Sequence, residues 1–241
     1  MLYNGLFSIL EKVDSTNNYA MARVHEGLAK HGMAWFAMDQ TAGKGQRGKA
    51  WESTPGESLI LSLAVQPGKG MPAAFFPFVA AISMQILNYC KSLNRDEWSL
   101  KWPNDIYWRD RKAGGILIEN VIRGRYWVWA IIGIGINMNQ ERFDDLLPNP
   151  VSISRITGQT YDVAAEGRIL HNQLMEIVDG FSMEQSGLIV SDYNRHLFKK
   201  GETVLLQHQD REIEAEITGV GRDGKLETSQ GKFAWGEVQW L

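Results

Sequence analysis

The sequence predicts an α+β fold, in which a mixed β-sheet with helices on one side is followed by a small C-terminal β-barrel. Two observations support this prediction. Short apolar strands linked by tight turns occupy much of residues 99–136, and long helical patterns lie before and after them. From Phe198 onward the chain changes to short strands separated by polar turns. We therefore expect two domains, residues 1–195 and residues 196–241.

The first half of the chain is expected to alternate between strands and helices. Ser15 or Thr16 begins the first helix, because serine and threonine are favoured N-caps. Pro77 is tolerated in the long apolar helix only in its first turn. In chain order, the pattern predicts a strand over 7–10, a helix over 17–29, strands over 34–38 and 59–65, and a helix over 73–93.

The second half is expected to add a series of strands, one further helix and the barrel. Arg123-Gly124-Arg125 is typical of a hairpin turn, and Asp162 is a favoured N-cap for the helix that follows. The expected elements are strands over 99–102, 106–108, 115–121 and 126–136, a helix over 162–178, and barrel strands over 203–207, 212–220, 225–228 and 233–235.

Composition excludes several classes of protein. The 241 residues carry a formal net charge of −3, which gives no general attraction to nucleic acid or to an anionic membrane. The single cysteine, Cys90, excludes an internal disulfide and favours a reducing compartment. No apolar run approaches the length of a membrane span, and the five histidines show no metal-ligand spacing. We expect a soluble cytoplasmic protein that binds neither nucleic acid nor membrane.

The segment Thr41–Trp51, TAGKGQRGKAW, combines three glycines with three cations. A backbone with few side chains can direct its N–H groups at an anion, and Lys44, Arg47 and Lys49 add positive charge. The segment fits a dinucleotide fingerprint and most of a P-loop. However, Ala50 replaces the Ser or Thr that a P-loop needs, and no helical pattern follows. It is therefore interpreted as an anion-binding loop of another kind, with a plain surface loop as the alternative.

Four further segments accompany this glycine loop in a fixed order. They are Asp14-Ser15-Thr16-Asn17 before it, then Lys101-Trp102-Pro103-Asn104-Asp105-Ile106, Lys112-Ala113-Gly114-Gly115-Ile116-Leu117-Ile118-Glu119, and an apolar run that ends in Asn137-Met138-Asn139. The ordered set closely resembles the catalytic domain of biotin–protein ligases, and the C-terminal segment resembles their small SH3-like domain. The resemblance covers nearly the whole chain and implies a class II aminoacyl-tRNA synthetase/biotin synthetase-like fold.

The resemblance implies an ATP-dependent enzyme that converts biotin to biotinyl-5'-AMP, releases pyrophosphate, and transfers biotin to a lysine of a biotin carboxyl carrier domain. Biotin and ATP with Mg²⁺ are then the ligands, the carrier domain of a carboxylase is the protein partner, and a homodimer is one assembly that the resemblance allows. Some relatives carry an N-terminal helix-turn-helix domain. Because the catalytic pattern begins within the first fifteen residues, we expect none here.

The resemblance also assigns roles to single residues. Lys112 is the cation at the junction of carboxylate and phosphate, where positive charge and positioning assist the reaction of two anions. Asp105 has three open roles: orienting Lys112, helping to hold Mg²⁺, or promoting deprotonation of the acceptor lysine. Arg47 is the third catalytic candidate. The biotin-binding candidates are Ser15, Thr16, Gln40, Gly43, Lys44, Lys112 and Gly115, and the nucleotide-binding candidates are Lys44, Lys49, Trp51, Asn104 and Asn137. No metal ligand is identified.

Simpler interpretations exist for several of these residues. Ser15 and Thr16 could serve only as helix caps, Trp51 could be a packing residue, and Lys112 could be a solvated hairpin lysine. Gln46 and Lys44 stand where arginine is usual in the family, and lysine lacks the bidentate fork of arginine. We therefore expect Arg47 or Lys49 to compensate in holding the adenylate.

Two other functions compete with biotin ligation. A lipoate–protein ligase of the same fold is the nearer alternative, and the glycine loop and the C-terminal barrel favour biotin over it. The other is a non-catalytic biotin- or nucleotide-binding regulator. The set of Lys112, Asp105 and Asn137 argues against it, because a protein that only binds does not need a cation at the reaction centre.

Overall fold

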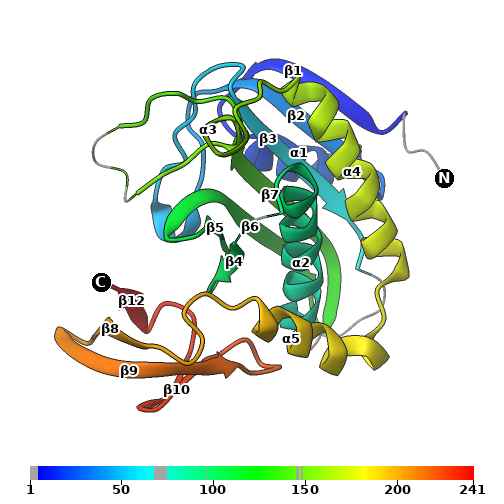
Figure 1. Ribbon diagram of the computed structural model, residues 1–241. Coiled ribbons are helices and arrows are strands. Elements are labelled where there is room, and N and C mark those ends of the chain that lie inside the picture. Colours follow the sequence, from blue (N-terminus) through cyan, green and yellow to red (C-terminus); the bar gives the residue numbers. More distant parts are fainter. Residues whose placement is uncertain (1–4, 68–74, 96, 145–146, 148) are drawn as a thin grey trace.

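The computed structural model describes residues 5–67, 75–95, 97–144, 147 and 149–241, and these form two β-sheets (Figure 1). The larger sheet has seven strands in the order β1-β2-β3-β7-β6-β5-β4. Strands β1 and β2 are parallel, and every other neighbouring pair in this sheet is antiparallel. The smaller sheet has five antiparallel strands in the order β11-β10-β9-β8-β12. The predicted mixed α+β class is confirmed.

The observed elements can be compared directly with the predicted ones. The larger sheet contains β1 (Phe7–Val13), β2 (Met33–Gln40), β3 (Ser58–Val65), β4 (Trp98–Lys101), β5 (Asp105–Trp108), β6 (Arg111–Arg123) and β7 (Tyr126–Asn137). The helices are α1 (Thr16–His25), α2 (Phe75–Leu93), α3 (Ile153–Thr157), α4 (Val163–Gly180) and α5 (Ser186–Arg195), with short 3-10 turns η1 (Gln46–Gly48) and η3 (Met183–Gln185). The smaller sheet contains β8 (Thr203–His208), β9 (Arg211–Val220), β10 (Leu226–Thr228), β11 (Gly231–Phe233) and β12 (Val238–Trp240).

Each predicted element has a counterpart, although several ends differ. The first helix begins after the N-cap Ser15 and ends at His25 rather than at residue 29, because Gly27 adopts a φ of 72° that helical backbone does not. Residues 73 and 74 of the predicted long helix lie outside the described part of the chain. The helices α3 and α5 and the strand β12 were not predicted; α3 and β12 have only five and three residues, too few for a periodic signal.

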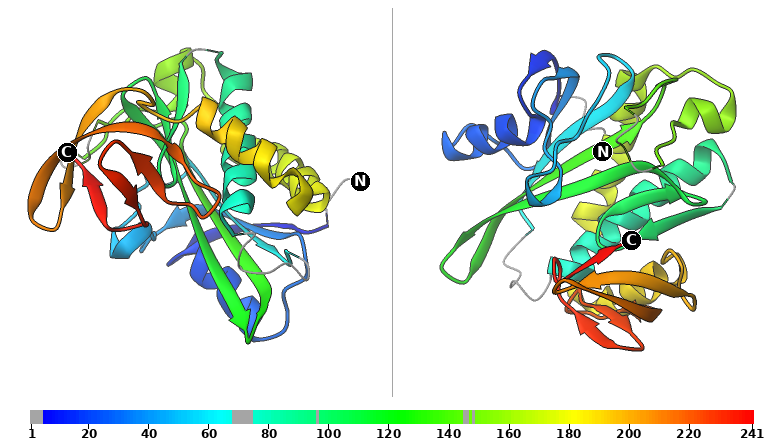
Figure 2. Two further views of the ribbon diagram at one scale, coloured as in Figure 1. Left: turned by 90° about the horizontal axis from the view of Figure 1, so that it is seen from below. Right: turned by 90° about the vertical axis from the view of Figure 1, so that its left-hand side faces the viewer.

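Helices cover both faces of the larger sheet (Figures 1 and 2). The side chain of Phe36 on β2 packs into the main core with α2 and α4. Its neighbour Trp35 points to the other face and packs with Ala20 and Val24 of α1. This alternation follows from the two-residue repeat of a strand. The sequence predicted helices on one face of the sheet only. The helices α2 and α4 form that layer, and α1 forms a smaller layer on the opposite face, over β2, β3 and β7.

The main core consists of α2 packed against the sheet. Most of α2 is buried, and Pro77 lies in its first turn as predicted. Cys90 is fully buried, and this burial raises the pKa of its thiol to about 12, so the residue acts as a packing group. Within the described residues, we find no helix that is both long and apolar enough to cross a bilayer.

The C-terminal sheet packs directly against the segment that precedes β5. Trp102 donates a hydrogen bond from Nε1 to the carbonyl of Gly224, at 3.0 Å. Trp240 donates from Nε1 to the carbonyl of Trp102, at 3.1 Å. The smaller sheet therefore holds the start of the Asn104-Asp105 segment from two directions. We retain residues 1–195 and 196–241 as the proposed division into domains; α5 ends at Arg195 and β8 begins at Thr203.

Candidate active site

The centre of the site is an ion pair between two neighbouring strands. The ammonium Nζ of Lys112 on β6 lies 2.8 Å from Oδ1 of Asp105 on β5, and both side chains are largely shielded from solvent. The pairing of β5 with β6 shifts by one residue between Ile106 and Tyr107, which leaves Ala113 as an extra residue on β6. Such a bulge changes the direction of nearby side chains. The bulge at Ala113 lies between Lys112 and Gly115, and Gly115 is the residue of β6 that pairs with Asp105.

The floor of the site is formed by two glycines on which Trp51 lies. Gly115 on β6 and Gly135 on β7 are paired in register. A Cβ atom added at Gly135 would collide with the indole ring of Trp51, and one at Gly115 would come within 3.3 Å of the same ring. The Nζ of Lys112 is 5.8 Å from the ring centroid. Glycine is therefore required here for the close approach of an aromatic ring to the sheet, beside the ion pair.

The glycine loop folds into a small hairpin between β2 and β3. The N–H of Gly45 donates to the carbonyl of Lys49 at 2.7 Å, and the N–H of Trp51 donates to the carbonyl of Gly43 at 2.9 Å. Arg47 at its tip adopts a left-handed φ of 55°. Lys44, Arg47 and Lys49 line a cavity of about 590 Å³, and Leu117 and Glu119 also line it. The loop does not open a helix, in agreement with the rejection of the P-loop interpretation.

A largely buried polar network reaches this cavity through Glu119. Thr16 donates from its backbone N–H to Oε1 of Gln40 at 2.9 Å, and its hydroxyl lies 3.2 Å from the same oxygen. The hydroxyl of Ser62 lies 2.7 Å from Oγ1 of Thr16 and 2.6 Å from Oδ1 of Asn17. Asn17 in turn donates from Nδ2 to Glu119 at 2.8 Å. These groups form a fixed set of donors and acceptors inside an otherwise apolar region.

Three residues of this network, Asn17, Ser62 and Glu119, were absent from the predicted site. Asn17 and Glu119 lie in segments that carried the resemblance but received no role, whereas Ser62 on β3 lies outside those segments. A signal for Ser62 was present, because it interrupts the apolar run SLILSLAV, in which every residue is buried. A buried hydroxyl in such a strand needs a hydrogen-bond partner, so it points to a polar neighbour.

The predicted capping role of Ser15 is also observed. Its side chain accepts from the N–H of Asn18 at the start of α1, at 3.5 Å, while the residue itself is buried. Gly43 lies against the side-chain amide of Gln40, and an added Cβ would collide with it. Capping and ligand contact are compatible for Ser15, since the cap uses only one lone pair of the hydroxyl.

The side chains of the two predicted nucleotide-binding asparagines donate hydrogen bonds to backbone carbonyls in this structure. Asn104 donates from Nδ2 to the carbonyl of Ile116 on β6. Asn137 donates from Nδ2 to the carbonyl of Val151 at 3.2 Å and lies 3.5 Å from the carbonyl of Lys112. Both side chains therefore position the strand that carries Lys112, and their contact with a nucleotide stays a prediction.

A second lysine lies near the ion pair without having been predicted. Lys101 on β4 points its ammonium at the rings of Tyr107, Phe198 and Trp240, at 5.0 to 5.5 Å from their centroids. Burial lowers its pKa, and the nearby carboxylate of Asp105 opposes that shift. The site thus combines Asp105 with two cations.

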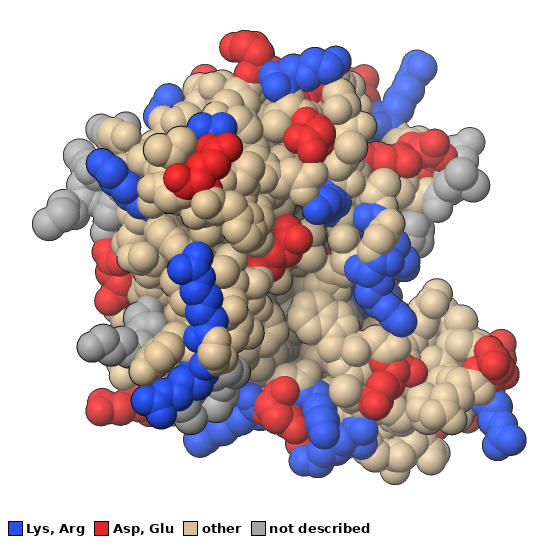
Figure 3. All heavy atoms as spheres, turned by 180° about the vertical axis from the view of Figure 1, so that it is seen from behind, with Lys and Arg blue, Asp and Glu red and all other residues tan. Residues whose placement is uncertain are grey.

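One face of the molecule is hollowed and carries charges of both signs. Figure 3 shows Lys and Arg side chains at one edge of the hollow between the C-terminal lobe and the rest of this face, and Asp and Glu side chains also lie beside the hollow. In the ranges that the structure describes, no group of three or more His, Cys, Asp or Glu side chains is placed to hold a metal ion. The arrangement is suited to anionic ligands that lie across the glycine floor.

Comparison with known proteins gives a consistent picture. Residues 9–137 match the model of the biotin/lipoate A/B protein ligase family. The bifunctional ligase/repressor BirA of Escherichia coli is 31% identical over 226 residues, which are 93% of this chain and 70% of that protein. The biotin–[acetyl-CoA-carboxylase] ligase of Paracoccus denitrificans is 31% identical over 160 residues, which are 64% of this chain and 65% of that protein.

Solved structures show the same fold over nearly all of the chain. A biotin protein ligase from Aquifex aeolicus in complex with biotin and ATP superposes with a TM-score of 0.81 at 24% identity. The match covers 98% of each chain, so it includes the C-terminal barrel as well as the larger sheet. The expected class of fold, including an SH3-like C-terminal sheet, is confirmed.

Proposed function

The chain belongs to the biotin/lipoate A/B protein ligase family, and we propose that it is an ATP-dependent biotin–protein ligase. In the first step, a carboxylate oxygen of biotin attacks the α-phosphorus of ATP, and the bond to the β-phosphate breaks to release pyrophosphate. In the second step, a carrier lysine attacks the carbonyl of biotinyl-5'-AMP, forms an amide, and releases AMP. The acceptor is the lysine of a biotin carboxyl carrier domain. The observation that carries the proposal is the shielded Lys112–Asp105 pair beside a glycine floor.

Lys112 supplies the charge that the first step needs. Two anions must approach each other, and negative charge increases at the reacting phosphate in the transition state. A fixed ammonium in a shielded site stabilises that charge more strongly than water does. Asp105 fixes the position of this ammonium through the 2.8 Å contact. The role proposed for Asp105 is therefore orientation of Lys112.

The buried polar network is proposed to bind the ureido ring of biotin. A buried urea group without hydrogen-bond partners costs about 1–3 kcal/mol per group. Thr16 donates to Gln40, and Ser15 and Thr16 are buried beside each other at the start of α1. Ser62 fixes the orientation of the Thr16 hydroxyl from behind. These residues favour biotin over lipoate, because the dithiolane ring of lipoate would leave the same groups unpaired.

The glycine loop is proposed to hold the phosphate end of the ligands. Lys44, Arg47 and Lys49 face one cavity, where they can neutralise the adenylate and restrain its release. Trp51 is proposed as the surface against which adenine packs, with Asn104 and Asn137 near its polar edges. The presence of Lys112, Asp105 and Asn137 together argues against a regulator that only binds ligand, because such a protein does not need a cation at a reaction centre.

A magnesium ion would arrive with ATP, because the described residues include no group of three or more His, Cys, Asp or Glu side chains placed to hold it without the nucleotide. Mg²⁺ usually keeps several waters and is held by one or two carboxylates together with substrate phosphates. Asp105 already pairs with the ammonium of Lys112 and is not proposed as a ligand of this ion, which the ATP phosphates and water would hold. The bound ion would neutralise charge on the ATP phosphates.

The decisive test is biotin-dependent exchange of labelled pyrophosphate into ATP, with lipoate as the competing acid. Biotin should support exchange, and lipoate should be disfavoured by about 10⁴-fold or more, since its ring leaves buried polar groups unpaired. A carrier domain added to the same reaction should become biotinylated. Equal exchange with the two acids would contradict the assignment of biotin, and absence of exchange with either would contradict adenylate formation.

A further inference from the structure

The tip of the glycine loop is in contact with the C-terminal barrel. Trp235 lies in the turn between β11 and β12, 189 positions from Gln46, and its Nε1 donates to Oε1 of Gln46 at 3.0 Å. The next residue of the turn, Gly236, is beside the next residue of the loop. A Cβ added at Gly236 would lie 3.3 Å from Cζ of Arg47. Two successive residues of the barrel thus meet two successive residues of the loop.

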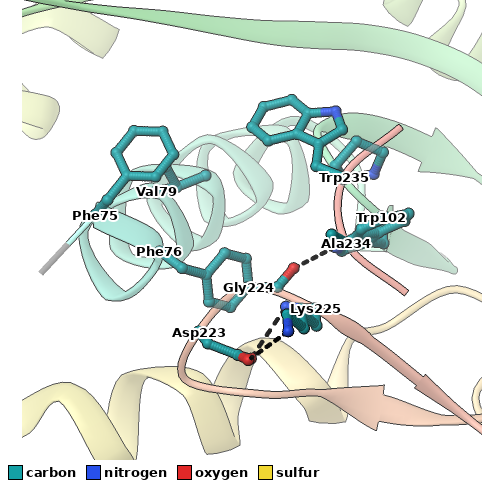
Figure 4. A pocket seen from close by; sticks show the side chains of 10 residues that line it. Phe75, Phe76, Val79, Trp102, Asp223, Gly224, Lys225, Ala234 and Trp235 are labelled. Atoms are coloured by element: carbon teal, nitrogen blue, oxygen red, sulfur yellow. Dashed lines mark hydrogen bonds and ion pairs between the residues drawn. The ribbon is translucent and has the colours of Figure 1, made fainter. Parts of the chain in front are cut away.

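The turn that presents Trp235 is itself fixed. The N–H of Ala234 donates to Oε2 of Glu237 at 2.6 Å, and the N–H of Glu237 donates to the carbonyl of Ala234 at 3.0 Å. Gly236 adopts a φ of 90°, which only glycine adopts readily. Figure 4 shows Trp235 facing a pocket that it shares with Trp102 and with Phe75 and Phe76 of α2. The indole therefore lines a pocket between α2 and the barrel and also donates to the loop.

The loop needs such an external contact. Arg47, Gly48 and Lys49 at its tip are exposed, and glycine-rich backbone loses much conformational entropy when it is ordered. Arg47 is also held in a left-handed conformation that non-glycine residues rarely adopt. A contact at Gln46 restrains the residue directly before Arg47, and so limits where the cation can point.

The contact is chemically specific. The indole of tryptophan can only donate a hydrogen bond, so its partner must accept one. The amide oxygen of Gln46 accepts, whereas the guanidinium of an arginine has no acceptor. Gln46 is absent from the lining of the loop cavity, which contains Lys44, Arg47 and Lys49. The side chain at position 46 therefore faces the barrel, and its neutral amide suits that partner.

We propose that Trp235 is a positioning residue for ATP, which holds the tip of the glycine loop in its ligand-binding conformation through Gln46. Trp235 acts on Arg47 and Lys49 by way of the loop backbone and does not touch the reacting atoms. The C-terminal barrel thereby contributes to the nucleotide end of the site. This inference rests on the proposed ligase function for its kinetic consequence, but its structural part does not.

Amide hydrogen exchange of peptides spanning residues 42–51 measures loop opening without any ligand. Trp235→Phe keeps an aromatic ring but removes the donor, and Gln46→Leu removes the acceptor. Each should lower protection of the loop amides about three- to tenfold, as loss of one neutral hydrogen bond implies. The double variant should lose no more than the more affected single variant, because both remove the same contact. Gln46→Glu keeps an acceptor and should stay within about twofold of the parent protein.

Kinetics supply the second readout, and Trp129→Phe on the far part of β7 is the matched control. In pyrophosphate exchange, Trp235→Phe should raise the KM for ATP about three- to tenfold and leave the KM for biotin within about twofold. Unfolding curves verify that each variant is folded. Independent, multiplicative losses of protection in the two single variants would overturn the proposal, as would a Gln46→Glu variant that behaves like Gln46→Leu. If the two single variants and the double variant lose the same amide protection but the parent protein shows no pyrophosphate exchange, the contact is supported and the ligase function is contradicted.

Discussion

The ammonium of Lys112 lies 2.8 Å from the carboxylate of Asp105, although a strand turn and a bulge separate the two residues along the chain. The pair is partly exposed, with 29% of the Lys112 side chain and 23% of the Asp105 side chain accessible. A pair of this kind adds little to stability. The value that we propose for it is orientation, because the carboxylate holds a long, flexible side chain beside the glycine floor.

This geometry predicts a double-mutant result. Lys112→Ala should lower the rate of biotinyl-adenylate formation by about 10²–10³-fold, since it removes charge stabilisation at the reacting phosphate. Asp105→Ala should also lower the rate, and the double variant should be no slower than Lys112→Ala alone, because orientation matters only while the lysine is present. Single-turnover adenylation measures each rate.

A control variant and a distinct result for the alternative role of Asp105 accompany this prediction. Arg195→Ala removes a solvent-exposed cation away from the site and should leave adenylation unchanged. If Asp105 acts independently, for instance by holding Mg²⁺, then the losses of the two single variants will multiply. That outcome would contradict orientation as its main role.

The glycine floor predicts a second effect. Gly135→Ala places a methyl group where the ring of Trp51 lies, so the indole must move away from the sheet. We expect a loss of about 1–3 kcal/mol in the free energy of unfolding from overpacking. Displacement of the ring should lower kcat/KM for ATP by about 10- to 100-fold. Steady-state pyrophosphate exchange and denaturant unfolding measure the two effects.

Gly180→Ala at the end of α4 is the matched control, because a Cβ there meets no atom within 4 Å. It should leave the kinetics unchanged. Normal ATP kinetics in Gly135→Ala would show that the position of Trp51 on the glycines is not needed for nucleotide use.

Local motifs were enough to indicate several of the residues from which this candidate site is built. The glycine loop, Lys112 and Asp105 come from short segments whose residue types already indicate their chemistry, and the structure brings them to one cavity wall and one ion pair. Ser62 and Trp235 could not be placed in the same way. The contact of Ser62 depends on how α1 lies on β3, and that of Trp235 depends on how the barrel docks. Neither relationship is encoded within a short segment.

The arrangement of helices around the sheet carries a similar lesson. Every residue of β3 is buried, which is typical of a strand covered on both faces. Apolar residues at successive positions, such as Trp35 and Phe36, contained the same information. The prediction of helices on one face of the sheet did not take this pattern into account. The helix α1 covers the second face.

The loop cations predict how long the intermediate is held. Arg47→Ala and Lys49→Ala should each accelerate release of biotinyl-adenylate, because each removes charge-assisted hydrogen bonds worth about 1.5–3 kcal/mol. This corresponds to an increase of roughly 10- to 100-fold in the dissociation rate if the bond is fully lost. Fluorescence chase of the bound intermediate measures the rate, with Arg195→Ala as the surface control. Unchanged release in both loop variants would limit these cations to substrate entry.

His171 predicts how stability depends on pH. This buried residue on α4 donates from Nε2 to the carbonyl of Gly32 at 2.8 Å and packs on Phe7, and burial lowers its pKa below the ordinary 6.5. Below pH 6.5 the unfolded chain therefore binds a proton that the folded chain resists. Stability should fall by up to about 1.4 kcal/mol per pH unit as pH decreases from 6.5 to the folded pKa.

Urea unfolding between pH 5 and 8 tests this sign. His171→Gln keeps a donor for Gly32 but has no proton to gain, so the part of the acid slope that comes from this site should disappear. Exposed His25 on α1 provides the control, and His25→Gln should keep the slope of the parent protein. Stability that rises on acidification through this window would contradict the assignment.

Ser62 predicts a selective effect on biotin. Its hydroxyl is fully buried and lies within hydrogen-bonding distance of Thr16 and Asn17, so Ser62→Ala leaves these groups without that partner. An unsatisfied buried group costs about 1–3 kcal/mol, part of which appears as misplacement of the Thr16 hydroxyl. We expect the KM for biotin to rise by about tenfold while the KM for ATP changes by less than about twofold. Ser83→Ala on α2 is the matched control, because Ser83 is equally buried but its hydroxyl has no hydrogen-bond partner among the described residues. If the two KM values rise together in Ser62→Ala, the network supports the whole site rather than the ureido end of biotin.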